Sequence, residues 1–137
     1  MQTTTALLAD AATVSNGKLF VHGGGITHLG AAQFPVRHPT LALVLVFRVE
    51  WTETSEEHAL EISLEDEDGR RRFDGQGKLT VGRPPGLAAG SAQFVPYTQT
   101  FNGIVFDAPG RFVFRIRAGE TELAELPLNV TETRAGP

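Results

Sequence analysis

Apolar and polar residues alternate with a period of two over much of the chain, and this alternation limits the folds open to it more than any other feature. Between residues 60 and 65, leucine and isoleucine alternate with glutamate and serine, and between residues 111 and 117, phenylalanine and isoleucine alternate with arginine and valine. Because residues two apart share one face of a β-strand, each segment would bury one face and expose the other. The pattern predicts an all-β domain.

One segment, Leu41–Phe47, is apolar throughout, which is typical of a central strand covered on both faces. Glycine-containing turns follow or precede the other strands at Asn16-Gly17, Asp68-Gly69 and Gly119, and they favour hairpins and antiparallel pairing. The short run Ala6–Ala12 contains good helix formers but is too short for a stable helix, so we predict that it is a strand.

Two further positions predict local irregularities. The inward-facing apolar residues have odd numbers before Asn102-Gly103 (Tyr97, Phe101) and even numbers after it (Ile104, Phe106), which predicts a bulge or bend there. The final strand, Ala124–Val130, contains Pro127, which has no N–H for a ladder hydrogen bond, so we expect this strand at a sheet edge. We also predict separate strands over 70–73 and 77–81.

About eight such strands predict a two-sheet antiparallel β-sandwich, immunoglobulin-like or jelly-roll in type. A chain of 137 residues is expected to form one domain over 1–137, with frayed ends near 1–4 and 132–137.

Composition excludes several kinds of chemistry. The chain has no cysteine, which removes disulfides, thiolate metal sites and thiol catalysis. Its net charge is −4 and it has no basic stripe, which argues against binding to nucleic acid. No apolar run has the length of a membrane helix and the N-terminus does not resemble a signal peptide, so we expect a cytoplasmic location and no membrane partner.

The stretch His22-Gly23-Gly24-Gly25 looks like the oxyanion motif of lipases. That motif requires a nucleophile in Gly-x-Ser-x-Gly, and no serine of this chain has that context. A phosphate-binding loop also fails, because its lysine and the helix after it are missing. We predict instead a bend between two strands, so that replacing Gly24 by valine would destabilise the fold.

Other residues that could carry chemistry have plain structural explanations. The four histidines, His22, His28, His38 and His58, match no metal-ligand spacing. The acidic run 65–68 departs from an EF-hand loop, although calcium binding by loop carboxylates stays a minor alternative. Trp51 and Tyr97 could stack on a sugar or a base. We therefore predict no catalytic residue, no cofactor and no metal.

The loop that begins Arg83-Pro84-Pro85-Gly86-Leu87 is stiffened by two prolines and is too long for a simple hairpin. Stiff loops with an arginine and an apolar side chain suit contacts with another protein, while a plain crossover between sheets is the alternative. The predicted contact surface comprises this loop and the glycine bend: Arg83, Pro84, Pro85, Leu87, His22 and Gly24.

Five segments together resemble a family of small bacterial all-β domains of unknown function. They are Ala9-Asp10-Ala11, Asn16–Phe20, Gly23–Gly25, Gly82–Leu87 and Pro109–Phe112. The resemblance covers almost the whole chain and implies a β-sandwich, without a known activity, cofactor or catalytic residue. The chain has Ile26 where the family usually has an aromatic residue after the glycines.

We therefore expect a non-catalytic, soluble protein-interaction or assembly module that binds a protein partner or associates with itself as a homo-oligomer. One alternative is a module for small ligands or carbohydrates that uses Trp51, Tyr97 or the histidines. A metal-dependent hydrolase is a weaker alternative.

Overall fold

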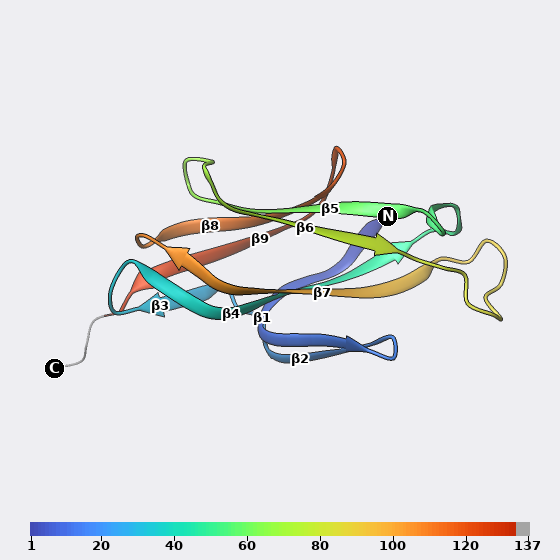
Figure 1. Cartoon of the computed structure of the whole chain (residues 1–137), viewed down its shortest axis with the longest axis horizontal. Coiled ribbons are helices and arrows are strands. Elements are labelled where there is room, and N and C mark those ends of the chain that lie inside the picture. The colour runs from blue at the N-terminus through green and yellow to red at the C-terminus, as the bar shows by residue number, and fades with distance from the viewer. Residues whose placement is uncertain (134–137) are drawn as a thin grey trace.

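A computed structural model describes residues 1–133 and shows two β-sheets packed face to face (Figure 1). The four-stranded sheet has the order β2-β1-β4-β7 and the five-stranded sheet has the order β3-β9-β8-β5-β6. The all-β sandwich is confirmed, with nine strands in the described range rather than about eight. The elements are β1 (Gln2–Ser15), β2 (Lys18–Gly24), β3 (His28–Ala31), β4 (Val36–Val49), the short 3-10 turn η1 (Trp51–Glu53), β5 (Glu57–Glu65), β6 (Arg71–Thr80), β7 (Gln93–Phe106), β8 (Gly110–Ala118) and β9 (Thr121–Glu132). No helix within residues 1–133 is long and apolar enough to cross a membrane.

The main core lies between the sheets and is built from the residues that alternate along each strand. Its largest fully buried side chains include Phe47, Phe106 and Phe114. The rings of Phe101 and Phe114 stack across the two sheets with their centroids 6.0 Å apart. The alternating segments of β5 and β8 therefore pack as the sequence predicts.

The central strand β4 is covered on its second face by the β1–β2 hairpin. The first half of β1 pairs with β4, and its second half pairs with β2. Figure 1 shows the hairpin end of β1 and β2 turned out of line with the rest of its sheet, as a separate layer next to β4 and β7. A second apolar cluster forms there around Ala9, Ala42 and Val44, with Leu19 packed against it. This cover explains why 41–47 carries no polar alternation.

The parity change near Gly103 is a bend shared by two strands. His38 pairs with Ile104 and Thr40 pairs with Asn102, so Pro39 and Gly103 lie opposite each other without a change of register. Gly103 has φ +72°, a conformation that favours glycine. Beyond this point the inward-facing residues of β7 switch from odd to even numbers, and the predicted bend is confirmed.

The position of β9 corrects one expectation. Strand β9 lies between β3 and β8, not at an edge, and its pairing with β3 is parallel rather than antiparallel. Pairing with β3 begins at Asn129, two residues beyond Pro127, so the proline needs no donor on that side. In the same sheet, the two strands predicted over 70–73 and 77–81 are one continuous strand, β6.

Both ends of the described range are hydrogen-bonded to neighbouring segments, while the expectation of frayed ends near 1–4 and 132–137 stays a prediction. Strand β1 begins at Gln2, which pairs with Arg48, and the amino group of Met1 contacts the Glu53 carboxylate. At the other end, the Thr133 N–H donates to the Ala31 carbonyl at 2.8 Å. Residues 134–137 lie outside the described range.

Candidate functional site

The glycines after His22 make the crossover from one sheet to the other. The N–H groups of Gly25 and Ile26 both donate to the Leu8 carbonyl, at 2.9 and 3.0 Å, where the chain leaves β2 for β3. Gly23 and Gly25 have φ of +63° and +89°, whereas Gly24 does not have a positive φ. A side chain at Gly23 would also overlap the Asp10 carboxylate. The bend is as predicted, but its strictest position is Gly23 rather than Gly24.

Arg83 anchors the proline loop to the rest of the protein. Its Nε donates to Thr54 Oγ1 at 2.7 Å and its Nη2 donates to the Trp51 carbonyl at 2.8 Å. The guanidinium carbon lies 3.7 Å from the centroid of the Trp51 ring, which is a cation–π contact. Arg83 is exposed, as a predicted contact residue should be, and two of its five guanidinium N–H groups donate within the fold. Leu87, another residue of the predicted contact surface, is half-buried.

Replacing Arg83 by alanine is expected to free the loop and lower the free energy of unfolding by about 1 kcal/mol, since two hydrogen bonds and one cation–π contact are lost. Trp51 is the single tryptophan of the chain, so its fluorescence reports the change directly. We expect a shift in its emission in Arg83→Ala and a smaller shift in Arg83→Lys, which keeps the charge. Emission unchanged in both variants would show that the guanidinium does not lie over the ring.

An apolar groove of about 510 Å³ lies beside this anchor, between the loop and the start of β7. Its walls include Pro84, Phe94 and Pro96, and the tip of the β1–β2 hairpin reaches it at Gly17. The Phe94 side chain is 64% exposed, the highest value among the large apolar residues of the described range. Gln93 Nε2 donates to the Gly82 carbonyl at 2.9 Å, which joins two residues that line the groove.

The structure brings together only part of the predicted contact surface. Arg83 and Pro84 line the apolar groove, and Pro85 is exposed on the same loop. His22 and Gly24 lie further along β2, paired with β1 away from the hairpin tip. The predicted residues therefore form two separate surfaces.

Strand β7 carries a feature that the sequence analysis missed. Among the described residues it has one partner strand, β4, so its other edge is free along its length. No charged residue occurs between Arg83 and Asp107, and this span contains all of β7. The long stretch without charge was the available signal, but it marks an exposed site only when the strand order is known.

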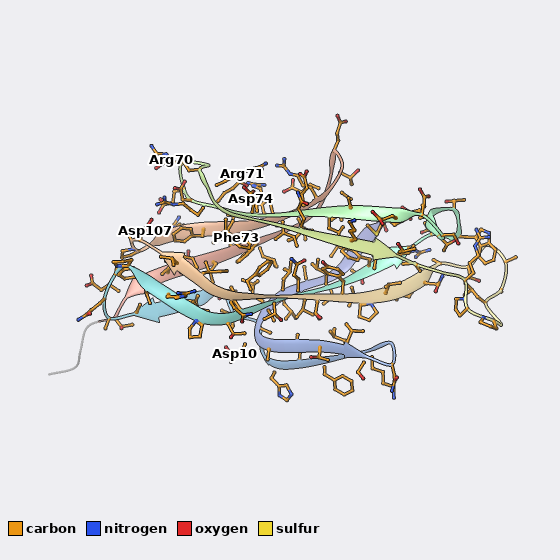
Figure 2. The ribbon with its side chains drawn as sticks, in the orientation of Figure 1. Asp10, Arg70, Arg71, Phe73, Asp74 and Asp107 are labelled. Carbon is orange, nitrogen blue, oxygen red and sulfur yellow. The ribbon has the colours of Figure 1, made fainter. Side chains whose placement is uncertain are left out.

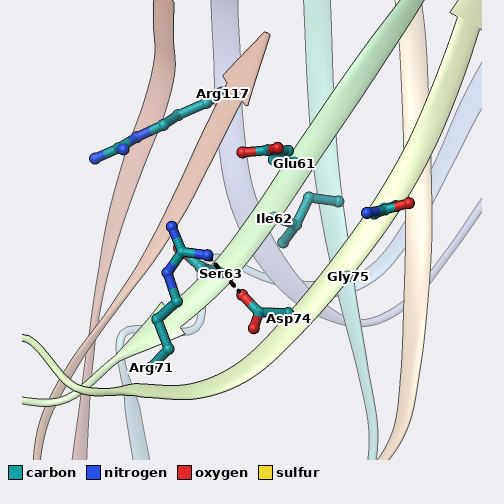
Figure 3. Close-up of a pocket in the computed structure, with 8 residues that line it drawn as sticks. Glu61, Ile62, Ser63, Arg71, Asp74, Gly75 and Arg117 are labelled. Atoms are coloured by element: carbon teal, nitrogen blue, oxygen red, sulfur yellow. Dashed lines mark hydrogen bonds and ion pairs between the residues drawn. The ribbon is translucent and has the colours of Figure 1, made fainter. Parts of the chain in front are cut away.

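A polar depression of about 210 Å³ lies on the outer face of the five-stranded sheet (Figure 3). Glu61, Arg71, Asp74 and Arg117 surround the small side chain of Ser63. Arg71 Nη1 and Asp74 Oδ1 are 3.3 Å apart, and Glu61 is directly opposite Arg117 in the sheet. Two acidic and two basic side chains line this depression, so their formal charges cancel and it offers no net charge to a ligand.

The basic run 70–72 and the acidic run 65–68 also neutralise each other. Figure 2 shows Arg70, Arg71, Asp74 and Asp107 gathered at one end of the sandwich. Arg72 lies 3.3 Å from the Asp66 carboxylate and 3.8 Å from that of Asp107. Asp66 Oδ1 also accepts the N–H groups of Asp68 and Arg70, so this carboxylate shapes the turn.

The histidines are distributed over separate elements. His28 Nε2 is 2.9 Å from Thr131 Oγ1, and His58 Nε2 is 2.8 Å from the Glu53 carbonyl. His22 is on β2 and His38 is on β4. Within residues 1–133, no group of three or more metal-ligating side chains is close enough to hold an ion.

Tyr97 lies between the sheets rather than on an open surface. Its hydroxyl donates to Gln99 Oε1 at 2.5 Å, and Gln99 Nε2 donates to the Gln76 carbonyl of β6 at 3.3 Å. Gly77 faces the Tyr97 hydroxyl at a distance that leaves no room for a side chain. Burial raises the pKa of Tyr97 above its ordinary value of 10.0.

Because Tyr97 is the single tyrosine, phenolate absorbance during a pH titration gives its pKa alone, and we expect a midpoint above 10.0. The unfolded chain loses this proton first, so the free energy of unfolding should fall as pH rises from 10 through the pKa of the folded state. Below pH 10 the contribution of the protonated Tyr97 hydroxyl to the free energy of unfolding is fully present. Tyr97→Phe should lack this alkaline loss, and a midpoint at or below 10 in the wild type would contradict the burial of the hydroxyl.

A family model described as "Family of unknown function (DUF6941)" matches residues 4–131. This range includes all nine strands apart from the first residues of β1 and the last of β9. No curated protein matches the sequence. The resemblance to an uncharacterised family, drawn from the motifs, is confirmed.

Proposed function

The chain belongs to the DUF6941 family, whose function is unknown, and we propose that it is a non-catalytic protein-interaction module. It would bind an extended segment of a protein by adding that segment as a strand to the free edge of β7. One observation carries the proposal: β7 is an edge strand of 14 residues that contains no charge and has the exposed Phe94 as its second residue.

The other long edge of the sandwich is protected against such pairing. A free edge presents unpaired N–H and C=O groups, and proteins commonly guard it with charged side chains. Strand β6, the edge of the five-stranded sheet, carries Arg71, Arg72, Asp74 and Lys78. Strand β2 is only half as long as β7 and begins with Lys18. The edge of β7 is uncharged and carries one proline, Pro96, which removes a single N–H, so among these three edges it is the one best suited to accept a strand.

The apolar groove supports the same surface. Strand addition gives affinity through main-chain hydrogen bonds, and pockets along the edge give specificity for side chains. Phe94 and Pro96 belong to β7 itself, and Pro84 faces them from the loop that Arg83 anchors. A groove held in place before binding costs less entropy to occupy. It would take one apolar side chain of the partner.

The proposal can be tested with a random peptide library displayed on phage and selected against the immobilised protein. We expect selected peptides to bind wild type at least about tenfold more tightly than Thr100→Lys or Phe94→Asp, a difference of about 1.4 kcal/mol. Hydrogen exchange of the complex should show new protection of β7 amides. Both substituted side chains are exposed, so circular dichroism should show an unchanged fold.

Phe20→Asp is the matched control, because Phe20 is 51% exposed and lies on β2. It should bind the selected peptides like the wild type. A library that yields no peptide above background, or peptides that protect β2 or β6 in place of β7, would contradict strand addition at β7.

A further inference from the structure

We infer that a segment bound to the edge of β7 is recognised in two ways, with Pro96 at the boundary between them. On one side of Pro96 the segment forms main-chain hydrogen bonds, at Thr98, Thr100 and Asn102. On the other side it is recognised by one apolar side chain, which lies in the groove against Phe94. This inference rests on the proposed function, because it names the chemistry of the segment that the same edge accepts.

The direction of the Leu8 carbonyl shows which residues of β1 face β4. In an antiparallel pair, residues that exchange hydrogen bonds alternate with residues that point the other way. Leu8 accepts the N–H groups of Gly25 and Ile26, which continue the chain from β2, so its main chain faces the β2 side of β1. Leu7 therefore faces β4, where its partner is Val44. The even-numbered residues of β4 in this stretch thus direct their main-chain groups to β1.

The same alternation, carried across β4, fixes which main-chain groups of β7 are free. Val44 lies opposite Thr98, and because Val44 faces β1, Thr98 directs its N–H and C=O to the free edge. A second contact agrees: Thr4 Oγ1 donates to the Val46 carbonyl at 3.1 Å, so Val46 also faces β1, and its partner on β7 is Pro96. The remaining even-numbered residues of this stretch follow the same alternation: Phe94, Thr100 and Asn102.

Pro96 is compatible with the fold because of this alternation, and it marks a gap in the free edge. Proline has no N–H, and at an even-numbered position the missing donor would have faced solvent rather than β4. Pro96 therefore offers the edge one acceptor, whereas Thr98 and Thr100 each offer a donor and an acceptor. Pro96 also lines the apolar groove with Pro84 and Phe94, whose side chain is 64% exposed. Consecutive main-chain donors thus lie on one side of Pro96, and the exposed apolar surface lies on the other.

Thr100→Pro tests the main-chain contacts, with the peptides selected from the phage library as probes. The substitution removes an N–H that faces the free edge, so the protein should unfold in urea near the wild-type midpoint, while peptide binding falls at least about tenfold. Thr100→Ala keeps the N–H and is the matched control, with binding like the wild type. A Thr100→Pro protein that binds like the wild type overturns the contact at Thr100. One that does not fold shows that this N–H is bonded to β4, which overturns the assignment as well.

Hydrogen exchange of the wild-type complex tests the same contacts without a substitution. The three even-numbered amides beyond Pro96 should gain protection when a peptide binds. The amides of Tyr97 and Gln99 should exchange slowly in the free protein already, because they face β4. New protection at odd-numbered residues alone would overturn the alternation.

The apolar side chain is tested on the peptide. Alanine in place of its apolar residue should weaken binding to the wild type at least about tenfold, and binding to Phe94→Ala by no more than about twofold, because the groove has lost a wall. Peptides that protect the even-numbered amides but tolerate alanine at every apolar position overturn recognition in the groove and leave strand addition intact. A library whose peptides protect no β7 amide contradicts the proposed function, and this inference with it.

Discussion

Gly23→Val is expected to lower the free energy of unfolding by about 2 kcal/mol, mainly through a left-handed backbone penalty, with a smaller steric cost at the exposed Asp10 side chain. Gly23 has φ +63°, where an L-residue costs roughly 1–2 kcal/mol. Its new Cβ would also overlap the carboxylate of Asp10 on the neighbouring strand β1. The damage falls where β2 leaves its sheet, so the crossover to β3 would loosen with it.

Gly24→Val is the matched control for this prediction, and urea unfolding measures both variants. The Cβ of Gly24 would lie 3.0 Å from Val21 Cγ1 and 3.4 Å from Leu7 Cδ1, and its backbone suits any residue. We expect it to cost less than Gly23→Val, about 1 kcal/mol. In an Asp10→Ala background, Gly23→Val should lose the part of its cost that comes from the overlap with Asp10 and keep the part that comes from the left-handed backbone. Equal costs at Gly23 and Gly24 would show that the left-handed conformation is not the cause.

Gly77→Ala is the second substitution with a large expected effect, a loss of about 1–3 kcal/mol from overpacking. A Cβ at this position of β6 would overlap the Tyr97 hydroxyl and lie 3.0 Å from Gln99 Oε1. The Tyr97 ring is half-buried and packed against the core, so it cannot swing aside freely. The added methyl group would push β6 away from β7.

A double-mutant cycle with Tyr97→Phe tests this cause. Phenylalanine lacks the overlapping oxygen but keeps the ring, so Gly77→Ala should cost at least about 1 kcal/mol less in the Tyr97→Phe background. Tyr97→Phe alone should cost about 1 kcal/mol, because its hydrogen bond to Gln99 is lost. Additive costs would mean that the hydroxyl is not what Gly77 accommodates.

The local features of the fold could be predicted because neighbouring residues decide them. The alternation in β5 and β8 reflects one buried face, and the turn at Asn16-Gly17 has positive φ at both residues, as its sequence indicates. The bend at Gly103 could be found because a change of parity leaves a trace in one strand. Each of these depends on a few adjacent side chains.

The sheet order could not be predicted because it depends on residues far apart in the chain. The cover over Ala42 and Val44 comes from a hairpin that turns back across β4, and β9 is interior only because the four residues of β3 pair with it. The position of β7 at a sheet edge follows from the same strand order, so the sequence could not indicate that Phe94 is exposed at that edge. Arg83 was singled out for its chemistry, but the neighbours that bind it, Trp51 and Thr54, precede it by some thirty residues.

The pairing of β3 with β9 has a consequence for how the chain folds as it is synthesised. Contacts between distant residues slow folding, because a long loop must close before they form. Residues 28–31 must wait for residues 129–132, so the five-stranded sheet cannot be completed until residues 129–132 have left the ribosome. Strand β7 emerges before β8 and β9, and its uncharged edge would be accessible to other nascent chains during that interval.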